Sequence, residues 1–226
     1  MGKRLVITVD GPAGVGKSTV SMRLATKMSY IYLDTGALYR AIAFKIRQSG
    51  FDLDDKRKLY ALCAKTDISL EMVNDGMRVM VGGKDITEEI RTEEIGALAS
   101  RVSAIPVVRE ALLPMQREAG KKGGIIAEGR DMGTVVFPDA DIKFFLCADV
   151  RERARRRQNQ LLEKEIYSDY LDIQKGLEKR DGQDTERSIS PLKPAEDAFI
   201  IDTTHLGIDG VTEEMMRLIS KKNEVL

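Results

Sequence analysis

Eight consecutive residues near the start of the chain match the pattern G-x-x-x-x-G-K-[ST]: Gly11, Pro12, Ala13, Gly14, Val15, Gly16, Lys17 and Ser18. Glycines at this spacing let successive backbone N–H groups turn inward around phosphate oxygens, with no Cβ in the way. An apolar run precedes the pattern and a helical pattern follows it, so the first turn of a helix faces the same anion. The pattern predicts a loop that binds a nucleoside triphosphate.

Two side chains in this loop have predictable tasks. Lys17 can reach the β- and γ-phosphates, and the Ser18 hydroxyl can bind Mg²⁺ directly. We also expect Thr19 to belong to the ATP-binding set. The loop by itself does not tell what is done with the triphosphate.

Arginines form the second group that could do chemistry, because the planar guanidinium binds phosphate with two hydrogen bonds. Arg40 follows Tyr39, and Gly129 and Gly133 bracket Arg130 and Asp131. A third group is a dense set on one charged stretch, followed by two further arginines: Arg151, Arg153, Arg155, Arg156 and Arg157, then Arg180 and Arg187. A charge run is usually a solvated helix face, and we keep that interpretation for most of the 151–157 group. Arg130 indicates a second phosphorylated substrate more strongly.

Other nucleotide-binding classes lack support. A guanine-nucleotide switch needs N-K-x-D and D-x-x-G, and neither pattern occurs. The net charge is zero over 226 residues, which argues against nucleic acid or an anionic membrane as partner. The only histidine is His205, and Cys63 and Cys147 lack metal-type spacing. We therefore expect the two cysteines to be buried thiols in a reducing cytosol and not a disulfide. No apolar run is long enough to span a bilayer, which takes about 18 residues.

Short apolar runs alternate with helical patterns, which predicts a parallel α/β sheet. The expected strands are Leu5–Val9, Tyr30–Leu33, Gly124–Ala127, Ile142–Cys147 and Ala198–Ile201. Open sheets of this kind bind ligands beyond the carboxyl ends of their strands. That edge would collect the glycine loop and the residues that follow each strand: Asp10, Asp34, Glu128, Arg130, Asp131, Asp149 and Asp202.

Helices are expected over Ser18–Met28, Pro106–Ala119, Val150–Lys164 and Asp209–Lys221. Pro114 predicts a kink or an early end in the second of these. Alternating residues over Asp67–Met72 and Met77–Val81, around the turn 73–76, predict an antiparallel hairpin inserted beside the main sheet. The stretch with Arg180 and Arg187 is poor in apolar residues, which suits a lid over substrate.

At this point the motifs coincide with a known family: the chain resembles the bacterial cytidylate kinases along essentially its whole length. The matching stretches are 10–18, 32–40, 90–94, Ser100 with 108–112, 128–138, 180–181 and 191–195. The resemblance implies a three-layer P-loop kinase fold with a five-stranded parallel sheet, a small antiparallel β insertion and a helical lid. It implies one kinase domain, with a core of 1–35, 123–149 and 190–226, a monophosphate-binding insertion at 36–122 and a lid at 150–189.

The resemblance also implies roles for individual residues. Arg40, Arg130 and Arg187 would hold the acceptor phosphate, Ser100, Arg109 and Asp131 would bind the cytosine ring, and Tyr39, Arg180 and Asp184 would contact the sugar, with Thr35 nearby. Arg153 and Arg156 are the best lid candidates to meet ATP, although Arg155 and Arg157 remain open alternatives. Lys17, Arg130, Arg156 and Arg187 form the expected catalytic set, and Glu128 would hold Mg²⁺ through water.

Cytosine chemistry agrees with these roles. The Asp131 carboxylate can accept a hydrogen bond from the N4 amino group, and Arg109 can donate to the ring acceptors. Uracil carries a carbonyl at C4, so its lone pairs would face the Asp131 charge and leave buried polar groups unpaired.

The expected reaction is transfer of the γ-phosphate of ATP to CMP or dCMP with Mg²⁺, in pyrimidine nucleotide metabolism. The expected protein is a cytoplasmic monomer that binds small molecules and neither nucleic acid nor membrane. Two alternatives remain open. One is a kinase for UMP or another small acceptor, and the other is a nucleotide-binding regulatory module without turnover.

Overall fold

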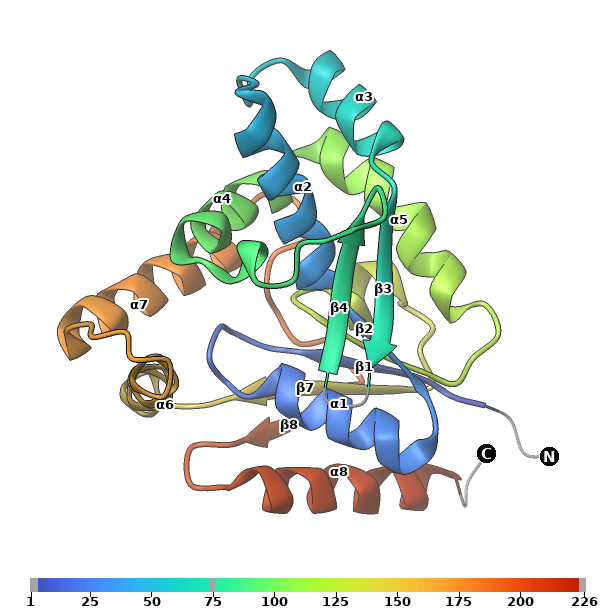
Figure 1. Ribbon diagram of the computed structural model, residues 1–226. Helices are drawn as coiled ribbons and strands as arrows, with labels where there is room; N and C mark the ends of the chain where they lie inside the picture. The colour runs from blue at the N-terminus through green and yellow to red at the C-terminus, as the bar shows by residue number, and fades with distance from the viewer. Residues whose placement is uncertain (1–3, 74–75, 224–226) are drawn as a thin grey trace. The chain divides into compact units, whose positions relative to one another are not determined.

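A computed structural model describes residues 4–73 and 76–223, and the chain divides into two compact units (Figure 1). Unit 1 comprises Met1–Ile31 and Gly123–Leu226, and unit 2 comprises Tyr32–Lys122. Unit 2 is therefore one continuous segment inserted into unit 1. The two units are described in turn.

The main sheet has five strands in the order β2-β6-β1-β7-β8. Their bounds are β1 Val6–Asp10, β2 Ile31–Asp34, β6 Ile125–Gly129, β7 Ile142–Cys147 and β8 Phe199–Asp202. β1 pairs in parallel with β6 and with β7, β7 pairs in parallel with β8, and every residue of β6 is buried. Strands covered on both faces read as continuous apolar runs, which is why the five predicted strands are confirmed with bounds that shift by two residues at most.

The register of β1 brings two loops to the same level. Asp10, the last residue of β1, pairs with Gly129, the last residue of β6. Neighbouring strands lie roughly 4.8 Å apart. Gly11 and Arg130, which follow these two residues, therefore begin adjacent loops at the carboxyl edge of the sheet.

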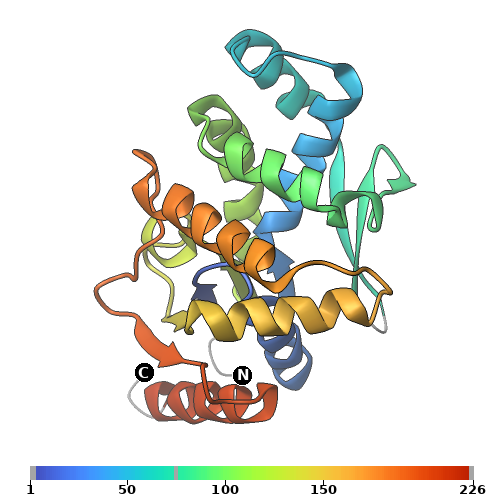
Figure 2. The same ribbon diagram turned by 90° about the vertical axis from the view of Figure 1, so that its left-hand side faces the viewer.

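Four α-helices belong to unit 1: α1 Lys17–Met28, α6 Val150–Leu162, α7 Tyr170–Glu186 and α8 Ile208–Asn223. α1 and α8 lie side by side along the sheet in Figure 1, with Leu24 of α1 and Met215 of α8 fully buried. Figure 2 shows α6 packed along α7. A short π-helical turn, η2 Met132–Val136, follows β6.

Unit 2 contains helices and a small antiparallel sheet. The helices are α2 Thr35–Ser49, α3 Lys56–Lys65, the 3₁₀ turn η1 Glu89–Arg91, α4 Glu93–Ser103 and α5 Pro106–Gly120. The strands β3 Ile68–Val73, β4 Gly76–Val81 and β5 Lys84–Asp85 pair in the order β3-β4-β5. The predicted hairpin is confirmed, while residues 74–75 of its predicted turn lie outside the described residues.

Pro114 does not end α5, which continues to Gly120, so the expectation of an early end is wrong. A proline removes its own N–H bond to the preceding turn, and its ring crowds the carbonyl group four residues earlier. Burial of Val108, Leu112 and Gln116 along one face holds the helix together across that missing bond. Tertiary packing outweighs the local preference here.

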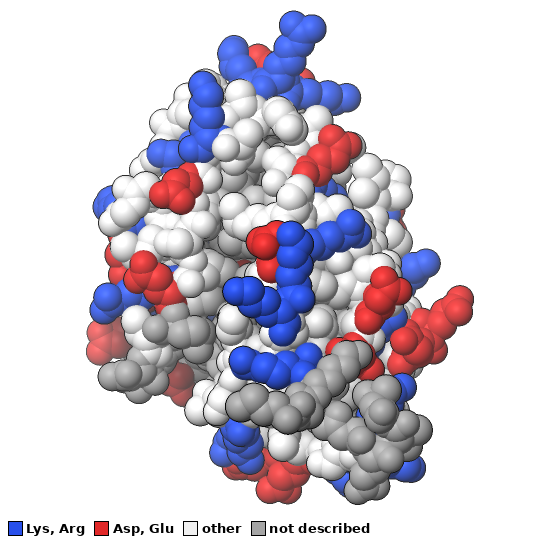
Figure 3. Space-filling model, turned by 90° about the vertical axis from the view of Figure 1, so that its right-hand side faces the viewer, with Lys and Arg blue, Asp and Glu red and all other residues white. Residues whose placement is uncertain are grey.

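The surface carries both signs of charge. On the face drawn in Figure 3, groups of basic and acidic side chains are interspersed among neutral residues. Exposed ion pairs such as Arg217–Glu214, at 2.6 Å, contribute to this mixing. Cys63 and Cys147 are both free thiols, as predicted, but only Cys63 is buried, so the expectation of burial is wrong for Cys147. Among the described helices, none has the length and apolar character needed to cross a membrane.

Candidate active site

The glycine loop has the backbone conformation that its sequence predicts. Gly11, Gly14 and Gly16 have φ values of 148°, 74° and 95°, a region that side chains with a Cβ rarely occupy. A Cβ on Gly11 would also collide with the carbonyl oxygen of Leu146 in β7. Glycine is therefore required at this position both by the backbone angle and by the neighbouring strand.

The N-terminus of α1 carries no side-chain cap, because its N-cap residue is Gly16. In contrast, side chains of Asp34, Asp55, Thr92, Asp149 and Asp169 cap other helices of the chain. The first N–H groups of a helix need acceptors, and a phosphate at this position supplies them. The start of α1 is thus built to receive an anion.

Lys17 is the first residue of α1 and is buried. Its Nζ donates to the Pro12 carbonyl oxygen at 2.7 Å, so the side chain folds back over the loop. Burial, followed by the cations Arg130 and Arg180, lowers the pKa of Lys17 to about 7, against the opposing effect of Glu128. A bound polyphosphate would raise this pKa again, because opposite charge favours the protonated amine.

Arg153 of α6 holds the glycine loop. Its Nη1 donates to the Ala13 carbonyl oxygen at 3.0 Å and to Asp181 Oδ2 at 2.5 Å, and its Nε donates to the Ala148 carbonyl oxygen at 3.1 Å. The Ala13 N–H donates to Asp181 Oδ1 at 3.4 Å. The glycine loop, α6 and α7 therefore meet at one partly buried ion pair, Arg153–Asp181.

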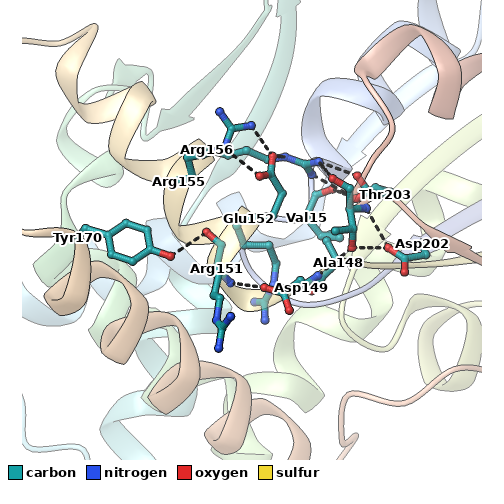
Figure 4. A network of polar contacts seen from close by, with 12 residues as sticks. Val15, Ala148, Asp149, Arg151, Glu152, Arg155, Arg156, Tyr170, Asp202 and Thr203 are labelled. Atoms are coloured by element: carbon teal, nitrogen blue, oxygen red, sulfur yellow. Dashed lines mark hydrogen bonds and ion pairs between the residues drawn. The ribbon is translucent and has the colours of Figure 1, made fainter.

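Arg156, one turn further along α6, is bound to the segment after β8 (Figure 4). Its Nη1 donates to Thr203 Oγ1 at 3.2 Å, its Nη2 to the Thr203 carbonyl oxygen at 2.6 Å, and its Nε to Glu152 at 3.0 Å. Thr203 Oγ1 in turn donates to the Val15 carbonyl oxygen at 3.2 Å. A single buried hydroxyl therefore joins the glycine loop to Arg156.

A second cluster in unit 1 contains the residues after β6. Arg130 Nε donates to Asp184 Oδ2 at 2.7 Å, and Arg187 Nη2 lies 3.7 Å from Asp131 Oδ1. The Asp131, Asp184 and Arg187 side chains are nearly fully buried. Two carboxylates and two guanidinium groups thus alternate in a small volume.

Arg180 belongs to the same environment through charge. Burial acts to raise the pKa of Asp184, but Arg130, Arg180 and Arg187 outweigh it and hold that pKa below its usual value. Arg187 is further fixed by a 2.5 Å hydrogen bond from its Nε to the Ser190 carbonyl oxygen. The structure therefore brings five predicted residues together from the segment between β6 and η2 and from the C-terminal end of α7: Arg130, Asp131, Arg180, Asp184 and Arg187.

Two buried carboxylates lie at the ends of the central strands. Glu128 is 3% exposed near the end of β6. Asp10 is 4% exposed at the end of β1 and accepts hydrogen bonds from the Met132 and Gly133 N–H groups at 2.8 Å each. Sequence reasoning placed Asp10 at this edge but gave it no partner.

Unit 2 groups the other predicted residues. The Arg109 guanidinium lies over the Tyr39 ring, 5.6 Å from its centroid, and Arg109 Nη1 donates to the Ser103 carbonyl oxygen at 3.1 Å. Arg40 forms a 2.8 Å ion pair with Asp34, which also caps α2. Thr35 is buried at the start of α2, and Ser100 lies on α4, where its carbonyl oxygen accepts from Ser103 Oγ.

Sequence reasoning missed three residues of these networks: Asp181, Thr203 and Glu152. Asp181 was noted only as part of the polar lid stretch, although its position next to Arg180 was a usable signal. Thr203 had no signal beyond its place after the last strand. Across residues 4–73 and 76–223, no group of three His, Cys, Asp or Glu side chains is arranged to hold a metal ion.

The strand–loop–helix geometry and the parallel sheet define the class: the protein is a P-loop kinase. Similarity to solved structures agrees on the fold, since a gluconokinase from Sinorhizobium meliloti superposes with a TM-score of 0.52 at 10% identity, covering 99% of this chain and 96% of that one.

Sequence comparison gives the family. The family model described as Cytidylate kinase matches residues 7–221. The cytidylate kinase of Syntrophotalea carbinolica is 45% identical, covering 100% of this chain and 96% of that protein. The cytidylate kinase of Coxiella burnetii is 48% identical, covering 96% and 92%. The chain belongs to the cytidylate kinase family.

Proposed function

We propose that this protein transfers the γ-phosphate of ATP to CMP or dCMP, forming ADP and CDP or dCDP, in pyrimidine nucleotide metabolism. One observation carries the proposal: Asp10 and Gly129 are paired at the ends of β1 and β6, so the glycine loop and the Arg130–Asp131 segment begin side by side. The glycine loop can hold a triphosphate, and the guanidinium groups around Arg130 can hold a second phosphate beside it. This arrangement suits the transfer of a phosphoryl group from one to the other.

The donor half consists of the residues Gly11–Thr19. The backbone N–H groups at the start of α1 would bind the β-phosphate, and Lys17 would move from the Pro12 carbonyl oxygen to the β- and γ-phosphates. Arg156 would lie against the nucleotide, while Arg153 would act on ATP by fixing the loop through Ala13. Arg153 as a direct ligand of ATP stays a prediction.

Mg²⁺ fits this half of the site. The Ser18 hydroxyl is exposed at the uncapped start of α1, and Glu128 lies at the end of β6. Ser18 would hold the ion directly and Glu128 through water. When bound, Mg²⁺ would neutralise charge on the β- and γ-phosphates.

The acceptor half in unit 1 is the cluster around Arg130. Arg130 and Arg187 would bind the phosphate of CMP, Arg180 and Asp184 the sugar, and Asp131 the N4 amino group of cytosine. In support, Arg187 is held by Ser190 and both carboxylates by arginines, so the groups are oriented before substrate arrives. Orientation in advance lowers the entropy lost on binding.

From unit 2, we propose that Arg109 and Ser100 bind cytosine, Tyr39 the sugar and Arg40 the phosphate, with Thr35 beside them. The resemblance to the family supports these roles. The packing of Arg109 over Tyr39 gives additional support, because it fixes the guanidinium of a residue expected to read the base.

The proposed phosphoryl transfer depends on positive charge that stabilises the transferring group, and it does not depend on proton transfer. An oxygen of the CMP phosphate attacks the γ-phosphorus, a new P–O bond forms, and the bond to the β–γ bridging oxygen breaks to release ADP. The attacking oxygen is already anionic, so no general base is required. Lys17, Arg130, Arg156 and Arg187 would stabilise the charge spread over the transferring group.

An acceptor panel tests this proposal. Purified protein with ATP and Mg²⁺ is assayed against CMP, dCMP, UMP and AMP by ADP formation, and CMP and dCMP should be preferred. In Asp131→Asn, the amide can donate to the C4 carbonyl of uracil, so the ratio of CMP to UMP efficiency should fall about tenfold or more. Asp139→Asn, an exposed carboxylate in the loop after η2, is the matched control. A preference of the unmodified protein for UMP, or equal losses for both substrates in Asp131→Asn, contradicts the assignment.

We also propose that the protein acts as a cytoplasmic monomer on small molecules, without nucleic acid. The interspersed surface charge and the zero net charge support the absence of nucleic acid as a partner. Sedimentation at assay concentration, with and without CMP, gives the oligomeric state.

A further inference from the structure

Asp10 connects two parts of the chain that sequence reasoning treated separately. It ends β1 and directly precedes Gly11, the first residue of the glycine loop. Its Oδ1 accepts from the Met132 N–H and its Oδ2 from the Gly133 N–H, both at 2.8 Å. Both oxygens of one buried carboxylate therefore bind consecutive amides more than 120 residues away in the chain.

The segment that Asp10 holds is the turn η2, which begins directly after Asp131. The Asp131 carbonyl oxygen accepts from the Val135 and Val136 N–H groups at 2.9 and 3.2 Å. The amides of Met132 and Gly133 stand at the beginning of this turn, where helical backbone has no internal acceptor for them. The Asp10 carboxylate supplies both acceptors, which fixes the backbone immediately after Asp131.

Gly133 shows that the turn is held close to the sheet. A Cβ at this position would lie 3.0 Å from Thr8 Oγ1 in β1 and 3.1 Å from Lys143 Cδ in β7. Both neighbours are buried, so neither can easily move away. The hydrogen bonds to Asp10 hold the turn η2 next to β1, and the lack of a side chain at Gly133 lets the turn approach that closely.

The charge of Asp10 acts on Lys17 in the glycine loop, but the backbone of that loop has other supports. Its carbonyl groups at Ala13 and Val15 accept from Arg153 and Thr203, and its backbone continues into α1. Loss of the Asp10 carboxylate would therefore displace Arg130 and Asp131 more than it displaces the triphosphate-binding groups.

We propose that Asp10 is a positioning residue for phosphoryl transfer, which sets the place of the Arg130–Asp131 acceptor segment relative to the glycine loop that follows it. The inference rests on the proposed function, since it takes Arg130 and Asp131 as acceptor-binding residues. Asp10 itself touches neither substrate. It acts through the backbone of Met132 and Gly133.

The test compares Asp10→Asn with Asp141→Asn in the full chain. The Asn side chain keeps one acceptor but turns an NH₂ group toward the second amide. Asp141 is a matched control, because its Oδ2 accepts from the Val6 N–H at 2.8 Å at the opposite end of the same strand. Steady-state kinetics give kcat and KM for CMP, and calorimetric titration with ADP gives the affinity of the glycine loop without acceptor.

For Asp10→Asn, kcat/KM for CMP should fall roughly 10- to 100-fold, because a displacement near 1 Å in a phosphoryl-transfer site costs about that much. ADP affinity should change less than about threefold, and Asp141→Asn should change both by less than about threefold. If the role of Asp10 were purely structural, Asp10→Asn would lower the urea midpoint of unfolding, but kcat/KM for CMP would not fall more than the affinity for ADP.

Gly133→Ala provides an independent arm, because it leaves the carboxylate intact and displaces the turn from the other side. It should reproduce the loss in kcat/KM for CMP with ADP affinity retained. If Asp10→Asn does not fold, Asp10→Glu and Gly133→Ala decide the question. The proposal is overturned if both variants lose no more CMP efficiency than Asp141→Asn, or if ADP affinity falls in parallel. Failure of the proposed function is seen separately, as the absence of CMP turnover in the unmodified protein.

Discussion

The stability of the protein should depend on pH through Asp10, and Asp10→Asn should remove that dependence. Burial, the largest effect, raises the pKa of Asp10 from 3.8 to about 6, and Asp131 adds to the rise. The hydrogen bonds from Gly133 and Met132 and the charge of Lys17 act in the opposite direction without cancelling it. The folded protein therefore favours the protonated carboxyl more than the unfolded chain does.

The sign and size of the effect follow from this difference. A raised pKa gives a stabilising contribution that is complete below the unfolded value of 3.8 and is lost as pH rises through about 6. One pKa unit corresponds to about 1.4 kcal/mol, so a difference of 6 − 3.8, or about 2.2 units, corresponds to roughly 3 kcal/mol. Asn carries no ionisable group and makes no such contribution at any pH.

Urea unfolding of both proteins at half-unit steps from pH 4 to pH 7.5 gives the measurement. The free energy of unfolding of Asp10→Asn, minus that of the unmodified protein, should increase by up to about 3 kcal/mol between pH 4 and pH 7 and then level off. Asp10→Asn also changes one hydrogen bond to the amides of Met132 and Gly133. That change adds the same amount to the free-energy difference at every pH, so the dependence of the difference on pH is unaffected. A difference that is flat from pH 4 to 7, or that falls, refutes the reasoning.

Three further predictions concern the glycine loop. Lys17→Met should lower kcat by at least about 100-fold while CMP affinity stays within about threefold, as measured by steady-state kinetics and CMP titration; an unchanged kcat would contradict the role of Lys17. Gly11→Ala should lower the free energy of unfolding in urea by about 1–3 kcal/mol. The control is Gly207→Ala, whose added Cβ would have no atom within 4 Å, and it should change that free energy by less than about 0.5 kcal/mol. Equal effects of the two substitutions would mean that the Leu146 contact is unimportant. A double-mutant cycle of Arg153→Ala and Asp181→Ala should give a coupling energy of about 1–3 kcal/mol, and additive losses would show that their ion pair contributes nothing.

The glycine loop and the parallel strands could be predicted because their determinants are local. The glycines, the preceding apolar run and the following helix are contiguous, and each buried strand is a continuous apolar segment of the sequence. β7 was predicted with the bounds it has, Ile142–Cys147. The hairpin β3–β4 was equally clear, since alternation along a strand is a short-range pattern.

Helix α7 was not among the predicted helices, and its surroundings explain why. Asp184 is its one buried residue, so the helix has no apolar stripe to detect. Instead, the Asp169 cap and the ion pairs of Asp181 and Asp184 hold it in place. Ion pairs between distant segments leave no periodic signal in the sequence.

Contacts between distant segments were equally hard to predict in the candidate active site. Arg130 and Arg187 could be named from motif and resemblance, but the partners of Arg153 and Arg156 could not. Both arginines bind backbone carbonyl groups, at Ala13 and Thr203, which every residue carries. A backbone acceptor is invisible in a sequence until the fold brings it into position.

The insertion of unit 2 has a consequence for how such proteins can be recombined. The Ile31 N–H donates to the Gly124 carbonyl oxygen at 2.8 Å, so the chain leaves unit 1 and returns to it one hydrogen bond apart. A segment whose two ends are adjacent can be exchanged for another of different length with little entropic penalty to its host. Residues 32–122 therefore form a transplantable cassette. Grafting the corresponding segment from a relative would separate the proposed contribution of Arg109 and Tyr39 to substrate choice from that of the residues of unit 1.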